Sequence, residues 1–302
     1  MRATVRVPAS VANLGPGFDM LALALQAQNE VVATPTDDGE VTIEIELVGS
    51  NPELLDPDHN LVARAYLEAC QRLGIPQRER GVHLRCTNSI PVAAGLGSSA
   101  AGTLSGVLVA VALHRAPWDE RQILDCAVGF EGHMDNVAAA LMGGLVICAP
   151  GAAVQRIDAP DEMHAVVFAP TDRLTTRAAR EVVPRQFSRE DAIFNASRCA
   201  LLVRAVALRD YPALREAMDD RWHQPQRTAL LPATGALITA AYEAGADGAC
   251  LAGAGPSVLA LCSRGHEPVS RAMQAAADRL ALPGTVLVLR PRNFGSRVEV
   301  RA

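Results

Sequence analysis

The chain has 302 residues, of which 49% are hydrophobic and 20% charged, and its formal net charge is -5. This composition is typical of a soluble globular protein, and the length predicts two domains of about 150 residues each. The negative charge and the absence of an arginine-rich run argue against a nucleic-acid or membrane-surface partner and favour a small molecule. The longest apolar run, residues 100–113, is too short to span a bilayer, and the amino terminus has no signal-peptide core, so we expect a cytoplasmic protein.

Cysteine and histidine usage gives no sign of a disulfide framework or a zinc site. The seven cysteines form no Cys-x-x-Cys pair, so we predict reduced and mostly buried side chains. The seven histidines show no spacing typical of zinc ligands. Any metal is therefore expected to be a hard cation brought by a ligand.

The first part of the chain predicts a mixed, largely antiparallel sheet. A helix is expected at Leu61–Leu73, with Asn60 as its cap. One segment, residues 41–47, alternates strictly between apolar and polar side chains, as in a strand with one buried and one wet face. Strands are expected at residues 4–7, 30–34, 41–47 and 82–86.

A polar loop, Pro8–Leu21, is predicted after the first strand. It carries Ser10, Asn13 and Asp19 among glycine and proline residues, and binding residues are commonly held in such loops. The alternative is a turn in which Asn13 and Asp19 hydrogen-bond to their own backbone.

The segment Pro91–Ala101 joins a small-residue loop to an apolar helix. Gly95 and Gly97 can adopt positive φ angles and let a ligand approach the backbone closely. Ser98 and Ser99 are predicted to cap the helix. A phosphate could then bind at the positive end of the helix without a basic side chain.

The same segment partly matches other phosphate-binding motifs. Gly95-x-Gly97-x-x-Ala100 loosely matches the dinucleotide motif, but Asp119 and Glu120 open a helix where that motif needs an acidic residue at the end of a second strand. A P-loop is excluded because the chain contains no lysine. The remaining alternative is that the segment is a purely structural loop beside a well-packed helix.

Four polar side chains gather after a helix that is expected to end near Phe130. More polar groups are present than a turn needs, which indicates a binding site, although a solvated loop explains the same composition. The four residues are Glu131, His133, Asp135 and Asn136.

The second half predicts alternating helices and strands, compatible with a two-layer α+β domain. We expect domains at residues 1–160 and 161–302. The turn Leu251–Val258, with Gly253 and Gly255, suits either close approach of a ligand or a bare hairpin. The expected elements are a hairpin at 145–157, strands at 164–169, 249–252, 258–262 and 285–289, and helices at 188–208, 232–244 and 267–280.

Three segments resemble, in the same order, the motifs of the GHMP kinases, a superfamily that includes galactokinase, homoserine kinase and mevalonate kinase. They are Pro8–Asp19, Pro91–Ala100 and Leu251–Ser257. The first segment and Gly132–Val137 are similar to the homoserine kinase branch in particular, although Met134 stands where that branch usually has proline. The resemblance implies an α+β fold, with a ribosomal protein S5 domain 2-like amino-terminal domain and a ferredoxin-like carboxy-terminal domain.

The resemblance also implies a reaction, the ATP-dependent phosphorylation of the side-chain hydroxyl of L-homoserine in threonine biosynthesis, with ATP and Mg²⁺ as cofactors. A homodimer is compatible with this resemblance. A GHMP kinase acting on mevalonate or a sugar, and a non-catalytic nucleotide-binding regulator, are the alternatives.

The same resemblance implies roles for individual residues. Ser98 and Glu131 match the magnesium ligands, and these two with Asn136 match the catalytic positions. The ATP-binding positions are Pro91, Ala94, Gly95, Leu96, Gly97, Ser98, Ser99, Ala100 and Ala101. The substrate-binding positions are Asn13, Asp19, His133, Asn136, Thr176, Arg180, Arg227 and Gly253.

Charge suggests how these residues would divide the substrate between them. Asp19 suits an α-ammonium group, and Arg180 and Arg227 suit an α-carboxylate, because a guanidinium grips a carboxylate with two parallel hydrogen bonds. Asn136 stands where related kinases have a basic aspartate, and an amide cannot accept a proton. We therefore expect Asp135 to be structural and the reaction to proceed without a protein base.

Overall fold

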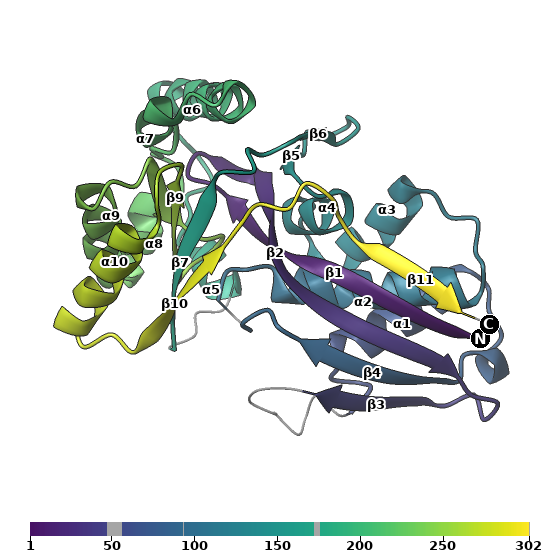
Figure 1. The fold of residues 1–302 in the computed structure, drawn as a ribbon. Helices are drawn as coiled ribbons and strands as arrows, with labels where there is room; N and C mark the ends of the chain where they lie inside the picture. The colour runs from purple at the N-terminus through teal and green to yellow at the C-terminus, as the bar shows by residue number, and fades with distance from the viewer. Residues whose placement is uncertain (47–55, 93, 172–175, 302) are drawn as a thin grey trace.

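The computed structural model describes residues 1–46, 56–92, 94–171 and 176–301. Two β-sheets lie side by side, one built mainly from the first half of the chain and one from the second (Figure 1). The strands of the first sheet are β1 (Arg2–Asn13), β2 (Gly17–Pro35), β3 (Val41–Glu46), β4 (Val82–Asn88), β5 (Leu145–Ile147), β6 (Gln155–Ile157) and β11 (Arg297–Arg301). The strands of the second sheet are β7 (His164–Pro170), β8 (Gly248–Leu251), β9 (Val258–Cys262) and β10 (Gly284–Leu289).

The first sheet has the strand order β11-β1-β2-β4-β3, with β5 pairing to β2 and β6 pairing to β5. Every described pair is antiparallel except β3 with β4, which is parallel. The mixed, largely antiparallel sheet predicted from the alternating strands is therefore confirmed. Leu47, the end of the strand predicted at 41–47, lies outside the described residues.

Helices of the first half cover one face of this sheet (Figure 1). Helix α2 contacts β1 on one side and its neighbouring helices on the others, so all of its residues from Ala100 to Ala110 are buried. Gly106 permits this crowding, since a Cβ atom there would lie 2.2 Å from the carbonyl oxygen of Val62 in α1. The helices are α1 (Leu61–Arg72), the 3₁₀ turn η2 (Gln77–Glu79), α2 (Ser98–Leu113), α3 (Glu120–Glu131) and α4 (Asp135–Met142).

The second sheet has a ferredoxin-like topology. Its strand order is β10-β7-β9-β8, and all its described pairs are antiparallel. Helices α5 to α9 connect β7 to β8, and α10 connects β9 to β10. The fold class expected from the family resemblance is confirmed. The helices of this half are α5 (Thr176–Glu181), α6 (Arg189–Leu208), η3 (Tyr211–Ala213), α7 (Leu214–Ala217), α8 (Gln224–Leu230), α9 (Ala233–Glu243) and α10 (Glu267–Arg279).

Both faces of the second sheet are covered, which explains why its inner strands are continuous apolar runs. In β7, Val166 and Phe168 pack in a cluster with α9 and α10, whereas the alternate residues Ala165 and Val167 belong to the larger core shared with the first half. The two halves of the chain therefore share one core.

The segment Pro8–Leu21 was predicted as a loop but forms a buried hairpin. β1 runs on to Asn13 and β2 begins at Gly17, so the turn is confined to residues 14–16. Residues 7–13 are all buried, because helices of the first half and residues of the second half pack around this strand. Tertiary packing here overrides the loop tendency of glycine and proline.

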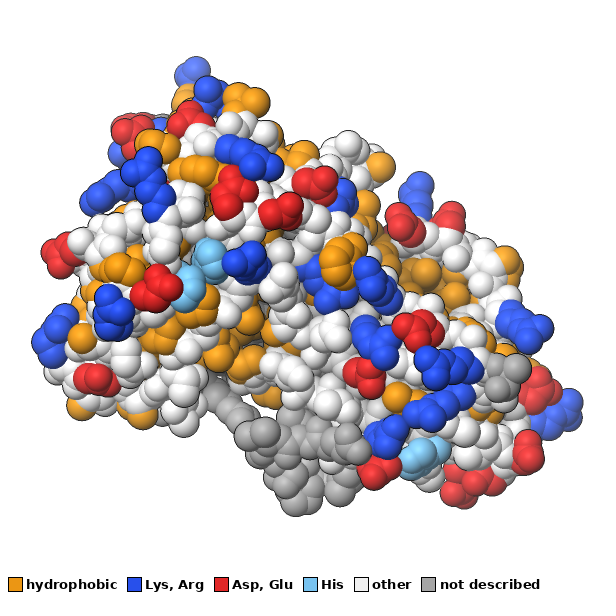
Figure 2. Space-filling model, viewed as in Figure 1, with side chains coloured by type: hydrophobic (Ala, Val, Ile, Leu, Met, Phe, Trp, Pro, Cys, Tyr) orange, Lys and Arg blue, Asp and Glu red, His pale blue; other side chains and the backbone are white. Residues whose placement is uncertain are grey.

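The last strand, β11, returns to the first sheet and was not predicted. Arg2 pairs with Arg301, and the two termini lie next to each other (Figure 1). β11 is exposed along its length, and Arg6 bonds to its Glu299 at 2.8 Å. Basic and acidic side chains are interspersed over this edge in Figure 2, which protects an edge strand from pairing with other chains. The domain boundary at residue 160 stays a proposal. Strand β11 belongs to the first sheet although it lies in the second half of the sequence.

Two expectations about composition can be compared with the structure. The prediction that the cysteines are mostly buried is confirmed, since all but Cys199 are buried. Among the described residues, no helix has the length and apolar character needed to cross a membrane.

Candidate active site

Three segments that are distant in the sequence meet at one end of α2. The backbone N–H of Ser10 donates to the carbonyl oxygen of Leu96 at 3.1 Å. The N–H of Gly253 donates to the carbonyl oxygen of Ala12 at 3.2 Å, and Nδ2 of Asn13 donates to the carbonyl oxygen of Gly253 at 2.7 Å. The β1–β2 hairpin, the loop before α2 and the β8–β9 turn therefore form one continuous surface.

Glycine is required at two positions of the loop before α2. Gly95 and Gly97 have φ angles of 67° and 68°, so the predicted positive φ is confirmed. A Cβ atom on Gly95 would lie 2.2 Å from the carbonyl oxygen of Ala252, and one on Gly97 would lie 2.3 Å from Oγ of Ser10. A side chain at either place would push the segments apart.

The first turn of α2 has no side-chain cap. Gly97, in the left-handed conformation, is the N-cap residue, and within the described part of the chain no side-chain cap bonds to the first turn. Ser98 and Ser99 are the first two helical residues, so the prediction that they cap the helix is wrong. The first N–H groups of a helix have no partner within it, and the helix dipole adds positive potential there. This helix end suits an anion.

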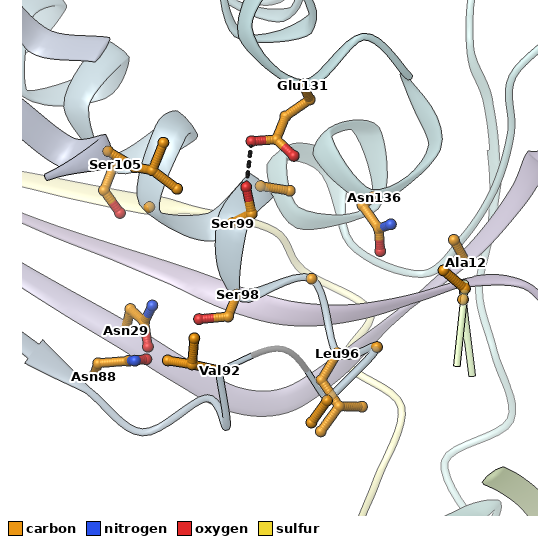
Figure 3. A pocket seen from close by; sticks show the side chains of 18 of the residues that line it. Ala12, Asn29, Asn88, Val92, Leu96, Ser98, Ser99, Ser105, Glu131 and Asn136 are labelled. Carbon is orange, nitrogen blue, oxygen red and sulfur yellow. Dashed lines mark hydrogen bonds between the residues drawn. The ribbon is translucent and has the colours of Figure 1, made fainter. Parts of the chain in front are cut away.

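A pocket of about 410 Å³ opens beside this helix end, a size typical of small-molecule sites (Figure 3). Ser98 lies between Asn29 and Asn88 on one side and Asn136 on the other in Figure 3. Apolar lining comes from the first sheet and α1, with Val31, Ile45, Leu61, Val62 and Cys86, and from Val92 and Leu96 of the loop before α2. The charged lining comes from Asp19, Glu30, Glu131, His133, Asp135, Arg180 and Arg227.

Glu131, at the end of α3, is fixed by two hydroxyl groups of α2. Its Oε1 atom accepts from Oγ of Ser99 at 2.7 Å and from Oγ1 of Thr103 at 2.8 Å. The hydroxyl of Ser98 also lines the pocket but points away from Glu131 in Figure 3. Among the described residues, Oε2 of Glu131 has no hydrogen-bond donor, so one carboxylate oxygen is left for another ligand.

Asp19 and Arg180, which were expected to contact opposite ends of a substrate, bond to each other. Nη1 and Nη2 of Arg180 donate to the two carboxylate oxygens of Asp19 at 2.8 and 2.6 Å. The hydrogen bond to Asp19 raises the pKa of Arg180, against the opposing effect of burial. The pair is about one-third exposed, so solvent and small solutes can reach it.

Arg227 is among the most deeply buried large side chains of the protein, with 1% exposure. Nε donates to the carbonyl oxygen of Ala179 at 3.0 Å, and Nη1 lies 2.9 Å from Nδ1 of His223 and 3.2 Å from the carbonyl oxygen of Gly253. Burial lowers the pKa of Arg227 to about 10, and the nearby charge of Arg180 adds to that effect. No carboxylate of the described residues pairs with this guanidinium, although it lines the pocket.

The polar cluster after α3 is brought into the pocket wall by the start of α4. Nδ1 of His133 lies 2.9 Å from Oδ1 of the buried Asp135, and this hydrogen bond raises the pKa of His133 despite burial. Oδ1 of Asp135 also accepts the backbone N–H of Asn136 at 2.8 Å. Oδ1 of Asn136 accepts from Oγ of Ser10 at 2.9 Å, and Asn136 lines the pocket.

Some expected site residues are not placed in the pocket. Pro91 does not line it, and Ala101 is buried within α2. Residue 93 and the side chain of Thr176, the first residue of α5, lie outside the described residues.

Several residues of the site could not be singled out from the sequence, among them Asn29 and Asn88 of the pocket wall and two residues that contact the site from behind, Thr103 and His223. Thr103 follows Ser99 by four residues and shares its acceptor, and His223 precedes Arg227 by four residues and contacts it. Spacing of i and i+4 on a helix is the signal that connects both pairs.

The family whose sequence models match is the GHMP kinases: the model of their N terminal domain matches residues 60–144, and that of their C terminal domain matches residues 202–279. The homoserine kinase from Synechococcus sp. is 40% identical to this chain, and the match covers 99% of this chain and 98% of that protein. The homoserine kinase from Moorella thermoacetica is also 40% identical, and the match covers 97% of this chain and 99% of that protein. The crystal structure of homoserine kinase from Cytophaga hutchinsonii has a TM-score of 0.86 and 28% identity, and covers 99% of this chain and 97% of that one. The chain belongs to the homoserine kinase family of GHMP kinases.

Proposed function

We propose that this chain transfers the terminal phosphoryl group of ATP to the side-chain hydroxyl of L-homoserine, giving O-phospho-L-homoserine in threonine biosynthesis. The observation that carries the proposal is the position of an uncapped helix end beside Asp19, Arg180 and Arg227 in one pocket. A phosphate site and an amino-acid site within one pocket are what this reaction needs.

The loop before α2 would hold the phosphates of ATP. Its backbone approaches the pocket closely because Gly95 and Gly97 have no side chains, and the N–H groups of the first turn of α2 are directed to the same place. The apolar walls from the first sheet and α1 offer room for the base of the nucleotide.

Magnesium fits the residues present, although no cluster of three or more acidic, histidine or cysteine side chains lies within the described part of the chain. Mg²⁺ is commonly bound by one or two protein oxygens together with phosphate oxygens. Glu131 offers Oε2, since Ser99 and Thr103 occupy its other oxygen, and we keep Ser98 as the second ligand. When bound, the ion would neutralise charge on the phosphates.

The substrate would bind at the charged end of the pocket. Arg227 offers a buried positive charge without a carboxylate partner, which suits the α-carboxylate. A zwitterion could also exchange with the Asp19–Arg180 pair, because its ammonium replaces Arg180 as the partner of Asp19 while its carboxylate replaces Asp19 as the partner of Arg180. We retain Asn13, His133, Asn136, Thr176 and Gly253 as further substrate contacts.

The proton of the substrate hydroxyl would leave without a protein base. Asn136 is an amide, and Asp135 already accepts from His133 and from the backbone of Asn136. The phosphates of ATP would receive the proton, directly or through water. The end of α2 would then stabilise the charge that develops on the transferred group.

A coupled assay of ADP release with homoserine, mevalonate and galactose tests this proposal. We expect turnover with homoserine alone. Turnover with mevalonate or galactose, and none with homoserine, would overturn the substrate assignment but keep the kinase assignment.

We also propose that the protein is located in the cytoplasm, and we keep a homodimer as a proposed assembly.

A further inference from the structure

His223 lies between the charged end of the pocket and the turn of the β1–β2 hairpin. It directly precedes α8 and is fully buried. Its Nε2 atom lies 2.7 Å from the carbonyl oxygen of Gly15, and its Nδ1 atom lies 2.9 Å from Nη1 of Arg227. One imidazole ring therefore connects a turn of the first half of the chain with an arginine of the second half.

The partners of the ring determine which nitrogen carries the proton. A guanidinium has only N–H donors, so Nδ1 of His223 accepts from Arg227 and carries no proton. Nε2 faces two acceptors, the carbonyl oxygen of Gly15 and a carboxylate oxygen of Asp220 at 3.5 Å, so the proton is on Nε2. Burial lowers the pKa of His223 to about 4, Asp220 opposes this shift and Arg227 adds to it. The ring is therefore neutral near pH 7.

A neutral acceptor affects Arg227 differently from a carboxylate. A carboxylate in this place would pair with the guanidinium and cancel its charge, whereas an imidazole fixes its direction and leaves the charge in place. Nε of Arg227 is used by Ala179, and Nη1 by His223 and Gly253. Nη2 is the nitrogen without a hydrogen-bond partner among the described residues.

The ring is held on several sides, so it can act as a rigid support. Asp220 accepts the backbone N–H groups of His223 at 3.0 Å and Gln224 at 2.7 Å, which fixes the start of α8. The ring of Phe18 lies 5.3 Å from the imidazole and 5.2 Å from the guanidinium carbon of Arg227. Rotation of the imidazole would break its hydrogen bonds to Gly15 and Arg227.

We propose that His223 is a positioning residue that directs the guanidinium of Arg227 toward the α-carboxylate of the substrate without neutralising its charge. The proposal rests on the proposed function, since it takes an amino-acid carboxylate as the ligand of Arg227. It deepens that function by assigning a role to a residue outside the family motifs noted in the sequence.

Three substitutions of His223 test separately the contact to Arg227, the contact to Gly15 and the effect of an added negative charge. The side-chain oxygen of His223→Asn can take the place of Nδ1 and still accept from Arg227, but it loses the contact to Gly15. The longer His223→Gln can reach Gly15 with its amide N–H but leaves Arg227 without its acceptor. His223→Asp has the shape of the Asn variant and adds the negative charge that the natural ring avoids.

Steady-state kinetics with ATP and homoserine measures the effect of each change. We expect His223→Gln and His223→Asp to raise the homoserine KM by about 10- to 100-fold, the size expected for a lost or neutralised charged contact. His223→Asn should stay within a few-fold of wild type, and kcat and the ATP KM should change little in any variant. Equal KM values in the Asn, Gln and Asp variants, or a fall in kcat without a change in KM, would overturn the proposal.

Proton and nitrogen NMR of the histidine rings of the intact wild-type protein gives a second measurement that needs no variant to fold. We expect one ring with the proton on Nε2 that remains neutral down to about pH 5. A proton on Nδ1, or titration of this ring near pH 6.5, would overturn the proposal. Absence of homoserine turnover in wild type would instead overturn the proposed function, and the NMR result would still decide the state of His223.

Discussion

Replacing Gly95 with alanine tests whether the loop before α2 and the β8–β9 turn are packed as one unit. Gly95 has a φ of 67°, and a Cβ atom there would lie 2.2 Å from the carbonyl oxygen of Ala252. The left-handed conformation costs an ordinary residue about 1 to 2 kcal/mol, and overpacking costs about 1 to 3 kcal/mol. We therefore expect Gly95→Ala to lower the free energy of unfolding by about 2 to 5 kcal/mol.

A matched variant, Gly74→Ala, isolates the conformational part of that loss. Gly74 follows α1 with a φ of 71°, and a Cβ atom there would have no heavy atom within 4 Å. Its loss should be about 1 to 2 kcal/mol, since only the backbone conformation is affected. Urea denaturation of both variants gives the steric contribution as the difference between them.

The two variants should also differ in their kinetics. Ala252 precedes Gly253, whose carbonyl oxygen accepts from Asn13 and from Arg227, so pushing this turn away from Gly95 disturbs both ends of the pocket. We expect Gly95→Ala to raise the KM for ATP and for homoserine, and Gly74→Ala to leave both unchanged. Equal losses of stability in the two variants, with unchanged KM values, would refute the reasoning.

Three further predictions concern single charged groups. Arg227→Ala should raise the homoserine KM by orders of magnitude, from a binding loss of about 2 to 5 kcal/mol, with little change in the ATP KM; an unchanged homoserine KM would remove this residue from the site. Glu131→Gln should lower kcat strongly, with partial recovery in excess Mg²⁺, whereas Glu120→Gln at the exposed start of the same helix should not; near-normal turnover would reject the metal assignment. Asp135→Asn should keep most turnover; turnover lower by several orders of magnitude in a folded variant would make Asp135 the base. The hydrogen bond to Asp135 raises the pKa of His133, so its contribution to stability is full below about pH 6.5 and is lost as pH rises through the raised pKa. In urea denaturation, Asp135→Asn should therefore lose more stability at pH 5.5 than at pH 9.

Much of the fold could be predicted because its signals are local. Alternation in strands such as residues 41–46 and the continuous apolar character of α2 follow directly from burial on one face or on all sides. The positive φ angles of Gly95 and Gly97 could be anticipated because only glycine adopts them readily.

Other features depend on contacts between distant residues, which a local pattern does not contain. The short helices α5 and α8 carry Arg180 and Arg227, yet 6 and 7 residues give too little periodicity to predict a helix. The bond between Asp19 and Arg180 joins residues 161 positions apart. Ser99 contacts Glu131 because successive helical residues point in different directions, so residue type alone could not distinguish it from Ser98.

The pairing of β11 with β1 has a consequence for biosynthesis. A ribosome makes β1 long before β11, since hydrogen-bonded residues of the two strands such as Arg6 and Glu299 are 293 positions apart, so the outer edge of β1 must wait for its neighbour. During that interval β1 is an open edge that could pair with another nascent chain. Because Arg2 pairs with Arg301, we expect a short linker that joins the two ends of this sequence to be tolerated, and a circularised chain of this kind would hold both strands together from the moment they fold.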